Sequence, residues 1–94
     1  MSISYDEAKR QANLAKHGID LAECAPFFDF PMLSQEDTRD SYGEQRTQSI
    51  GWLHGQIVYL VWTERPDSTR LISCRKATPH EARRYRQFLH QGGT

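Results

Sequence analysis

Several residue types that can bind and cleave a phosphodiester fall within a short stretch of the chain, between positions 64 and 85. They are Glu64, Arg65, Arg70, Ser73, Arg75 and Tyr85. Arginine can hold a phosphate through two parallel hydrogen bonds and can stabilise the charge that builds in the transition state. A carboxylate, a histidine or a tyrosine can move protons at a 2′-hydroxyl and at the leaving oxygen. Phosphodiester chemistry is therefore one interpretation, beside a binding or a purely structural role.

The structural alternative is specific for two of these residues. Glu64 and Arg70 flank the same predicted turn, so antiparallel pairing would place them close together. A cross-strand ion pair at such a position is common, and it contributes at most about 1 kcal/mol when it is exposed.

Charge is distributed unevenly along a chain whose formal net charge is zero. Residues 1–44 contain nine acidic and four basic residues. Residues 65–94 contain two acidic residues and seven basic ones, which are Arg65, Arg70, Arg75, Lys76, Arg83, Arg84 and Arg86. This asymmetry predicts a basic surface that faces an anion in the second half of the chain. The alternative is that the two halves neutralise each other across the fold.

Two helices are expected before the sheet. Asp6 can cap a first helix that runs to about position 17, with Gly18 as its left-handed stop. Lys16-His17 lies at the end of this helix, where the helix dipole favours positive charge, and this is a structural explanation for both residues. Asp20 can start a second short helix, which Asp29-Phe30-Pro31 would end because the residue before proline avoids helical geometry.

The sheet is predicted from three clear strands and one short one. Strand 56–64 is apolar on both faces and is therefore expected to be central. In strand 69–77, alternation assigns Ile72 and Cys74 to one face, and Leu71, Ser73 and Arg75 to a more open face. The other strands are expected at 46–53 and 32–35, with a polar loop at 36–44.

A last helix is expected from Thr78-Pro79-His80-Glu81, which combines an N-cap, a first-turn proline and a capping-box glutamate. Tyr85 lies on its inward side. The predicted fold class is α+β, with two N-terminal helices, a three- to four-stranded antiparallel sheet and a C-terminal helix.

Length and composition exclude several classes of protein. The 94 residues correspond to one domain, 1–94. No run approaches the roughly 20 apolar residues of a membrane span, and the N-terminus has no signal-like stretch, so we expect a cytoplasmic protein without a membrane partner. Cys24 and Cys74 are expected to be free and buried. The four histidines show no ligand spacing, so neither a metal nor another cofactor is expected.

A series of short motifs covers almost the whole chain, from about Tyr5 to Leu89. They are Asp6 with Lys9 and Asn13, Lys16-His17-Gly18-Ile19, Glu23-Cys24-Ala25, Phe28-x-Phe30-Pro31, Gly43-Glu44-x-Arg46, Ile50-Gly51, Thr63-Glu64-Arg65, Arg70 to Ala77, and Glu81-x-x-x-Tyr85. In this order the chain resembles the BrnT family of type II toxins, small ribonucleases with a RelE-like fold. Cys24, Cys74 and Ala82 depart from the usual family residues.

The resemblance implies a toxin that cleaves RNA and blocks translation. It implies metal-independent cleavage by 2′-hydroxyl attack, which leaves a cyclic phosphate. It also implies neutralisation by a BrnA-type antitoxin, a DNA-binding protein that forms a hetero-oligomer with the toxin and represses their operon. The toxin would then contact DNA only through the antitoxin.

The hypothesis that combines residues and resemblance assigns phosphate binding to Arg70 and Arg75. Proton transfer is assigned to His17, Glu64 or Tyr85. Further contacts with the substrate are assigned to Lys16, Arg65, Ser73, Lys76, Arg83 and Arg84. Two alternatives stay open: a catalytically inactive module that binds RNA or the ribosome, and a module whose role is to hold the antitoxin in operon repression.

Overall fold

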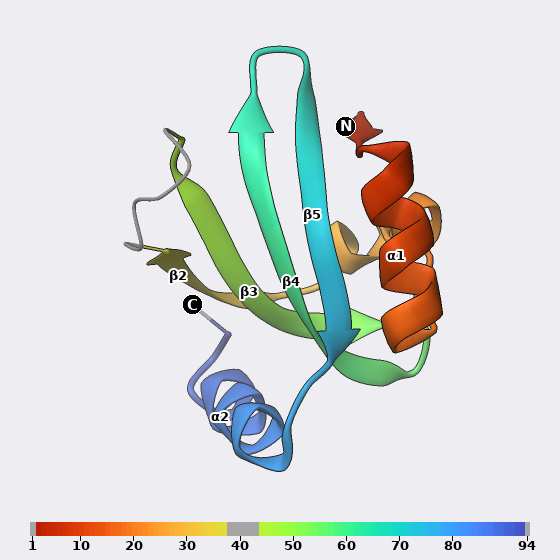
Figure 1. Ribbon diagram of the computed structural model, residues 1–94. Helices are drawn as coiled ribbons and strands as arrows, with labels where there is room; N and C mark the ends of the chain where they lie inside the picture. The colour runs from red at the N-terminus through yellow and green to blue at the C-terminus, as the bar shows by residue number, and fades with distance from the viewer. Residues whose placement is uncertain (1, 38–43, 94) are drawn as a thin grey trace.

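The computed structural model describes residues 2–37 and 44–93, which form a five-stranded sheet flanked by two α-helices and two short 3-10 helices (Figure 1). In chain order the elements are β1 (Ile3–Ser4), α1 (Glu7–His17), η1 (Leu21–Glu23), η2 (Ala25–Asp29), β2 (Met32–Asp37), β3 (Arg46–Leu53), β4 (Gln56–Arg65), β5 (Ser68–Lys76) and α2 (Pro79–His90). The strand order is β1-β5-β4-β3-β2. Strand β1 pairs with β5 in parallel, and the other neighbours are antiparallel.

The predicted α+β class and the central position of the strand at 56–64 are both confirmed. The predicted three- to four-stranded antiparallel sheet is wrong, because β1 adds a fifth strand and makes the sheet mixed. Strand β1 has only two residues, which are too few to show the alternation by which a strand is recognised in a sequence. The predicted loop at 36–44 is also shifted, since β2 continues to Asp37; residues 38–43 lie outside the described part of the chain.

Both predicted α-helix starts are confirmed by their caps. The Asp6 carboxylate accepts a hydrogen bond from the Lys9 backbone N–H at 3.1 Å, and Gly18 ends α1 with a φ of 71°. At α2, the Thr78 hydroxyl and the Glu81 carboxylate form a complete capping box. These local signals fix the ends of both helices because each satisfies backbone groups that the helix itself leaves unpaired.

The predicted second N-terminal helix is wrong in type, because the segment forms the 3-10 helices η1 and η2. Pro26 lies in the first turn of η2 and has no N–H to continue an α-helical hydrogen-bond ladder. The buried residues Leu21, Cys24 and Phe27 recur every third position, which matches three residues per turn. The packing of these three side chains therefore selects the tighter helix.

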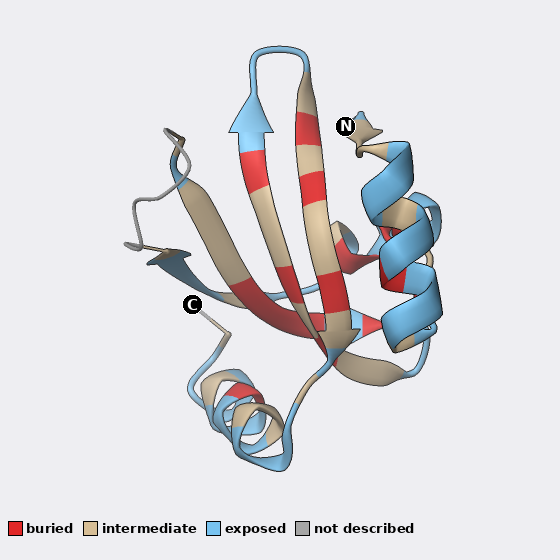
Figure 2. Cartoon of the chain, viewed as in Figure 1, coloured by how far each residue is buried: buried red, intermediate tan, exposed pale blue. Residues whose placement is uncertain are grey.

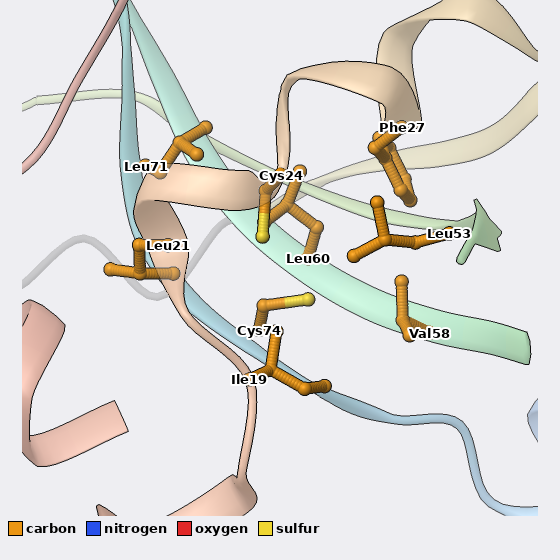
Figure 3. Packing of buried hydrophobic residues seen from close by; sticks show 9 residues of the cluster. All are labelled: Ile19, Leu21, Cys24, Phe27, Leu53, Val58, Leu60, Leu71 and Cys74. Carbon is orange, nitrogen blue, oxygen red and sulfur yellow. The ribbon is translucent and has the colours of Figure 1, made fainter. Parts of the chain in front are cut away.

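The hydrophobic core lies on one face of the sheet, beneath η1 and η2 (Figures 2 and 3). Its nine buried residues are Ile19, Leu21, Cys24, Phe27, Leu53, Val58, Leu60, Leu71 and Cys74. Both cysteines are free and buried, as predicted. Gly51 leaves room for Phe27, since a Cβ there would lie 2.6 Å from the Phe27 ring.

A β-bulge in β5 corrects the predicted division of that strand into two faces. Val61 pairs with Ser73 and the next residue of β4 pairs with Leu71, so Ile72 has no partner opposite it. As a result Leu71 points into the core, although alternation had assigned it to the open face. The same shift brings Arg70 onto the open face, because it pairs with Thr63. Bulges commonly re-aim side chains in this way.

Candidate functional site

The face of the sheet that points away from the core presents its side chains in rows that cross the strands. One row contains Leu33, Ile50, Tyr59 and Arg75, from β2 to β5. The next row contains Gln35, Gln48, Val61 and Ser73. We call this the open face. Helix α2 lies at the end of the sheet where β5 finishes, and it covers the first of these rows (Figure 1).

Arg75 is bound to a carboxylate of its own chain at the α2 end of the open face. Its guanidinium donates two hydrogen bonds to Glu81, of 2.9 and 3.0 Å, and lies 4.1 Å from the centre of the Tyr59 ring. The hydrogen bonds to Glu81 raise the pKa of Arg75, and those from Arg75 lower the pKa of Glu81. The geometry shows that Arg75 can hold an anion through two of its oxygens, as a carboxylate or a phosphate offers them.

A basic hollow of about 200 Å³ lies between α1 and β5. Its lining includes Lys9, Lys16, His17, Ile72 and Ser73, and no carboxylate of the described residues belongs to it. We call it the α1–β5 hollow. It brings together three of the predicted residues, namely Lys16, His17 and Ser73, from distant parts of the sequence. Two ammonium groups and an imidazole beside a hydroxyl form a local environment that favours an anion.

Asn13 fixes the position of α1 beside this hollow. Its side-chain amide donates to the Cys74 carbonyl at 2.9 Å and accepts from the Cys74 N–H at 3.0 Å. It also donates to the Ile19 carbonyl at 2.8 Å. The side chain is almost fully buried, and it satisfies backbone groups on the outer side of β5 as a neighbouring strand would. The hollow is therefore held between two rigid elements.

The residues at the β4–β5 turn are divided between the two faces. Arg70 pairs with Thr63 on the open face, whereas Glu64 pairs with Thr69 on the opposite side. The expected ion pair between Glu64 and Arg70 is not formed; within the described residues Arg70 has no ion-pair partner. Arg65 is exposed and donates a 3.1 Å hydrogen bond to Glu44.

Tyr85 is buried on α2, the helix that contacts β2 and β3. Its hydroxyl donates to the Pro31 carbonyl at 2.7 Å, and burial raises its pKa. This contact ties α2 to the start of β2. Tyr85 does not line the α1–β5 hollow with His17 and Ser73, and its hydroxyl is already bonded to Pro31.

The remaining predicted residues are exposed and basic. Lys76 ends β5 on the side of the core, opposite Val58. Arg83 and Arg84 lie on the surface of α2, and Arg84 also lines a cavity between α2 and the sheet.

Two features of the site were missed by reasoning from the sequence. Lys9, Asn13 and Lys16 are spaced i, i+4 and i+7, so they share one side of α1, and this spacing was a signal that could have been used. The approach of Tyr59 to Arg75 depends on strand register, for which the sequence carries no comparable signal.

The described residues, 2–37 and 44–93, offer neither a metal site nor a membrane-spanning helix. No group of three or more histidine, cysteine or acidic side chains in these ranges could hold a metal ion. No helix there is long and apolar enough to cross a membrane.

Comparison with known proteins gives one finding. Residues 5–81 match a protein family described as "Ribonuclease toxin, BrnT, of type II toxin-antitoxin system". No curated protein matches the chain. The matched range contains the α1–β5 hollow, Arg70 and the ion pair of Arg75, and it ends at Glu81, so Tyr85 lies beyond it.

Proposed function

Because the chain belongs to the BrnT family of ribonuclease toxins from type II toxin–antitoxin systems, we propose that it is an endoribonuclease whose site is the open face of its sheet. The observation that carries this proposal is the α1–β5 hollow, where Lys16 and His17 lie beside Ser73 and the described part of the chain contributes no carboxylate. A phosphate bound there would lie beside an imidazole able to transfer a proton. We also propose that the fold is RelE-like.

In the proposed reaction, His17 removes the proton of a 2′-hydroxyl, and the freed oxygen attacks the neighbouring phosphorus. The bond from phosphorus to the 5′-oxygen breaks as the new bond forms, and the departing oxygen takes a proton from water, while the proton held by His17 is released to solvent. The products are a 2′,3′-cyclic phosphate and a 5′-hydroxyl. Lys9, Lys16 and Arg70 would stabilise the charge that develops on the phosphate oxygens.

The other predicted residues receive narrower roles in this scheme. Arg75 would bind a second phosphate, which would replace the Glu81 carboxylate as its partner. Glu64 remains a candidate for proton transfer, although it lies on the opposite face from Arg70. For Tyr85 we propose a structural role, because its hydroxyl is already bonded to Pro31.

In the cell, we propose that the toxin acts in the cytoplasm, where RNA cleavage blocks translation. A BrnA-type antitoxin would neutralise it by binding, and the resulting hetero-oligomer would contact DNA through the antitoxin. We expect that induced expression arrests growth, and that co-expression of the antitoxin restores it. Unimpaired growth during induction would contradict this role.

The central test uses purified protein and RNA in the presence of EDTA, which examines the proposed independence from metal. We expect the wild type to cleave, and His17→Ala to reduce cleavage by about 100-fold or more, within the range for losing a general acid or base. His90→Ala is the matched control, because His90 is exposed at the far end of α2. Intact RNA with the wild type, or equal loss in both variants, would overturn the proposal.

A second function is favoured by one observation. The guanidinium of Arg75 is occupied by Glu81, so this arginine would be unavailable to a substrate unless the ion pair opens. A catalytically inactive module that binds RNA, the ribosome or the antitoxin would need no such opening. Binding of RNA without cleavage in the same assay would identify this alternative.

A further inference from the structure

A cavity of about 390 Å³ separates α2 from the open face, and its lining combines a flat apolar floor with polar walls. The floor is formed by Leu33, Ile50 and Tyr59, which belong to one cross-strand row. Gln35 and Gln48 form one wall. Arg84 lies on the α2 side together with Glu81, whose carboxylate is ion-paired with Arg75. This volume lies within the range of small-molecule sites, which are typically apolar with a few placed polar groups.

The two glutamines carry hydrogen-bonding groups that the protein does not use. Gln35 and Gln48 face each other across β2 and β3. In the part of the chain that the structure describes, neither side-chain amide has a hydrogen-bond partner. A primary amide offers two donors and one acceptor oxygen. Gln48 is half-buried and Gln35 is exposed, so both amides are accessible to a ligand in the cavity. The wall therefore suits a ligand whose edge presents both donors and acceptors.

One cross-strand row of the open face contains residues of both the cavity and the proposed phosphate site. Gln48 pairs with Val61, and Val61 pairs with Ser73, which lines the α1–β5 hollow. Neighbouring strands lie about 4.8 Å apart, so Gln48 and Ser73 are separated by about 10 Å. Tyr59, which is part of the cavity floor, also contacts Arg75: the guanidinium carbon lies 4.1 Å from the centre of the Tyr59 ring.

We propose that this cavity binds one nucleobase of the RNA, beside a phosphate held in the α1–β5 hollow. The inference rests on the proposed ribonuclease function and adds to it a site that reads the substrate. Single-stranded RNA is recognised through splayed bases that stack on flat side chains and hydrogen-bond along their edges. Paired amides above an apolar floor, with guanidinium groups at the border, favour a base attached to a phosphate over a segment of a partner protein.

The test is an NMR titration that follows the side-chain amide signals of Gln35 and Gln48 in the full chain. The probes are the four nucleoside monophosphates and, as a probe without a base, ribose 5-phosphate. We expect at least one nucleotide to shift both amide signals while ribose 5-phosphate leaves them in place. Gln48→Leu should weaken nucleotide binding by about tenfold, the discrimination typical of a good contact to a base edge. Gln87→Leu, the same change on the exposed surface of α2, should not.

Two results would overturn the nucleobase site: equal shifts with ribose 5-phosphate, or no shift with any nucleotide. If a purified antitoxin shifts these signals while nucleotides do not, the cavity is a protein-docking site and the inference is also overturned. Cleavage of an RNA of random sequence supplies the second readout. Gln48→Leu should flatten the wild-type preference for the base next to the cut, and an unchanged preference would count against the site.

The two proposals fail in different ways. Amide shifts with nucleotides, in a protein that leaves RNA intact, would remove the ribonuclease function and leave the base site standing. RNA cleavage without any amide shift would remove the base site and leave the ribonuclease function.

Discussion

The guanidinium of Arg75 and the carboxylate of Glu81 form a two-point ion pair, with hydrogen bonds of 2.9 and 3.0 Å, at the junction of β5 and α2. Glu81 thereby occupies the group that an RNA phosphate would bind. Because Glu81 also belongs to the capping box of α2, the ion pair links an anion site to the start of a helix. The proposed binding of RNA at Arg75 would therefore compete with a carboxylate that the protein supplies.

The first prediction follows from this competition. Glu81→Gln should raise the affinity for a non-cleavable 2′-deoxy oligonucleotide by up to about fivefold, because a partly exposed ion pair contributes up to about 1 kcal/mol. Glutamine can still complete the capping box, so α2 should stay folded. Fluorescence anisotropy measures the affinity. Glu23→Gln is the control for net charge, since Glu23 is exposed on η1; an equal gain in both variants would point to a nonspecific charge effect.

The second prediction compares two arginines of the same hairpin. Arg70→Gln should lower kcat/KM for RNA cleavage by about 100-fold, the usual effect of losing a group that stabilises transition-state charge. Arg65→Gln should change it little, because Arg65 is exposed at the turn and bonded to Glu44. Single-turnover cleavage of a labelled RNA measures both variants. A larger loss from Arg65→Gln would place the site at the turn instead of on the open face.

The third prediction concerns the attachment of α1. Asn13→Ala should lower the free energy of unfolding by about 2–3 kcal/mol, because it leaves the Cys74 N–H and carbonyl without their partner. Urea denaturation measures this loss, and hydrogen exchange should become faster at the Cys74 amide. Gln11→Ala, at an exposed position of the same helix, should cost less. Equal losses would mean that helix propensity, and not the contact with β5, explains the effect.

The fourth prediction concerns acid stability. Hydrogen bonds from the Arg10 side chain, and then from the Ala22 backbone, lower the pKa of Asp20 from 3.8 to about 2. A carboxylate with a lowered pKa in the folded state contributes stability that is present above its ordinary pKa and is lost as the pH falls through the folded value. The wild type should therefore exceed Asp20→Asn in stability at pH 7, and this difference should shrink as the pH falls towards 2.

Urea midpoints at several pH values measure the difference between the wild type and Asp20→Asn. Asp29→Asn changes an exposed carboxylate at the end of η2 and serves as the control. A gap between the wild type and Asp20→Asn that stays constant from pH 7 to pH 2 would contradict the assignment.

Local signals predicted much of the fold, because they act over a few residues. The caps at Asp6 and Thr78 fix the helix starts, and the apolar character of 56–64 identifies the central strand. The bulge at Ile72 could not be predicted in this way, since the strand pattern is equally compatible with unbroken alternation. That single residue decides whether Arg70 shares a face with Ser73 and Arg75.

The sequence indicated the residue types of the candidate site, but it predicted only part of their arrangement in space. His17, Lys16 and Ser73 were predicted as separate contributors, and the structure brings them to one hollow because Asn13 binds α1 to β5. Glu64 and Tyr85 were predicted for the same site by residue type. The first is directed to the opposite face by strand register, and the second is bonded to a carbonyl. Residue type alone does not show in which direction a side chain points in the fold.

The parallel pairing of β1 with β5 has a consequence for biosynthesis. Ser4 and Ser68 are hydrogen-bonded through their hydroxyls although they are 64 residues apart in sequence, and Ser4 pairs with Arg70. During translation, β1 can pair with β5 only after most of the chain has emerged from the ribosome. A domain completes its long-range contacts only when both segments are available. The strand segment that carries Arg70 pairs with β1 only near the end of synthesis. The fold around Arg70 is therefore incomplete while the chain is still attached to the ribosome.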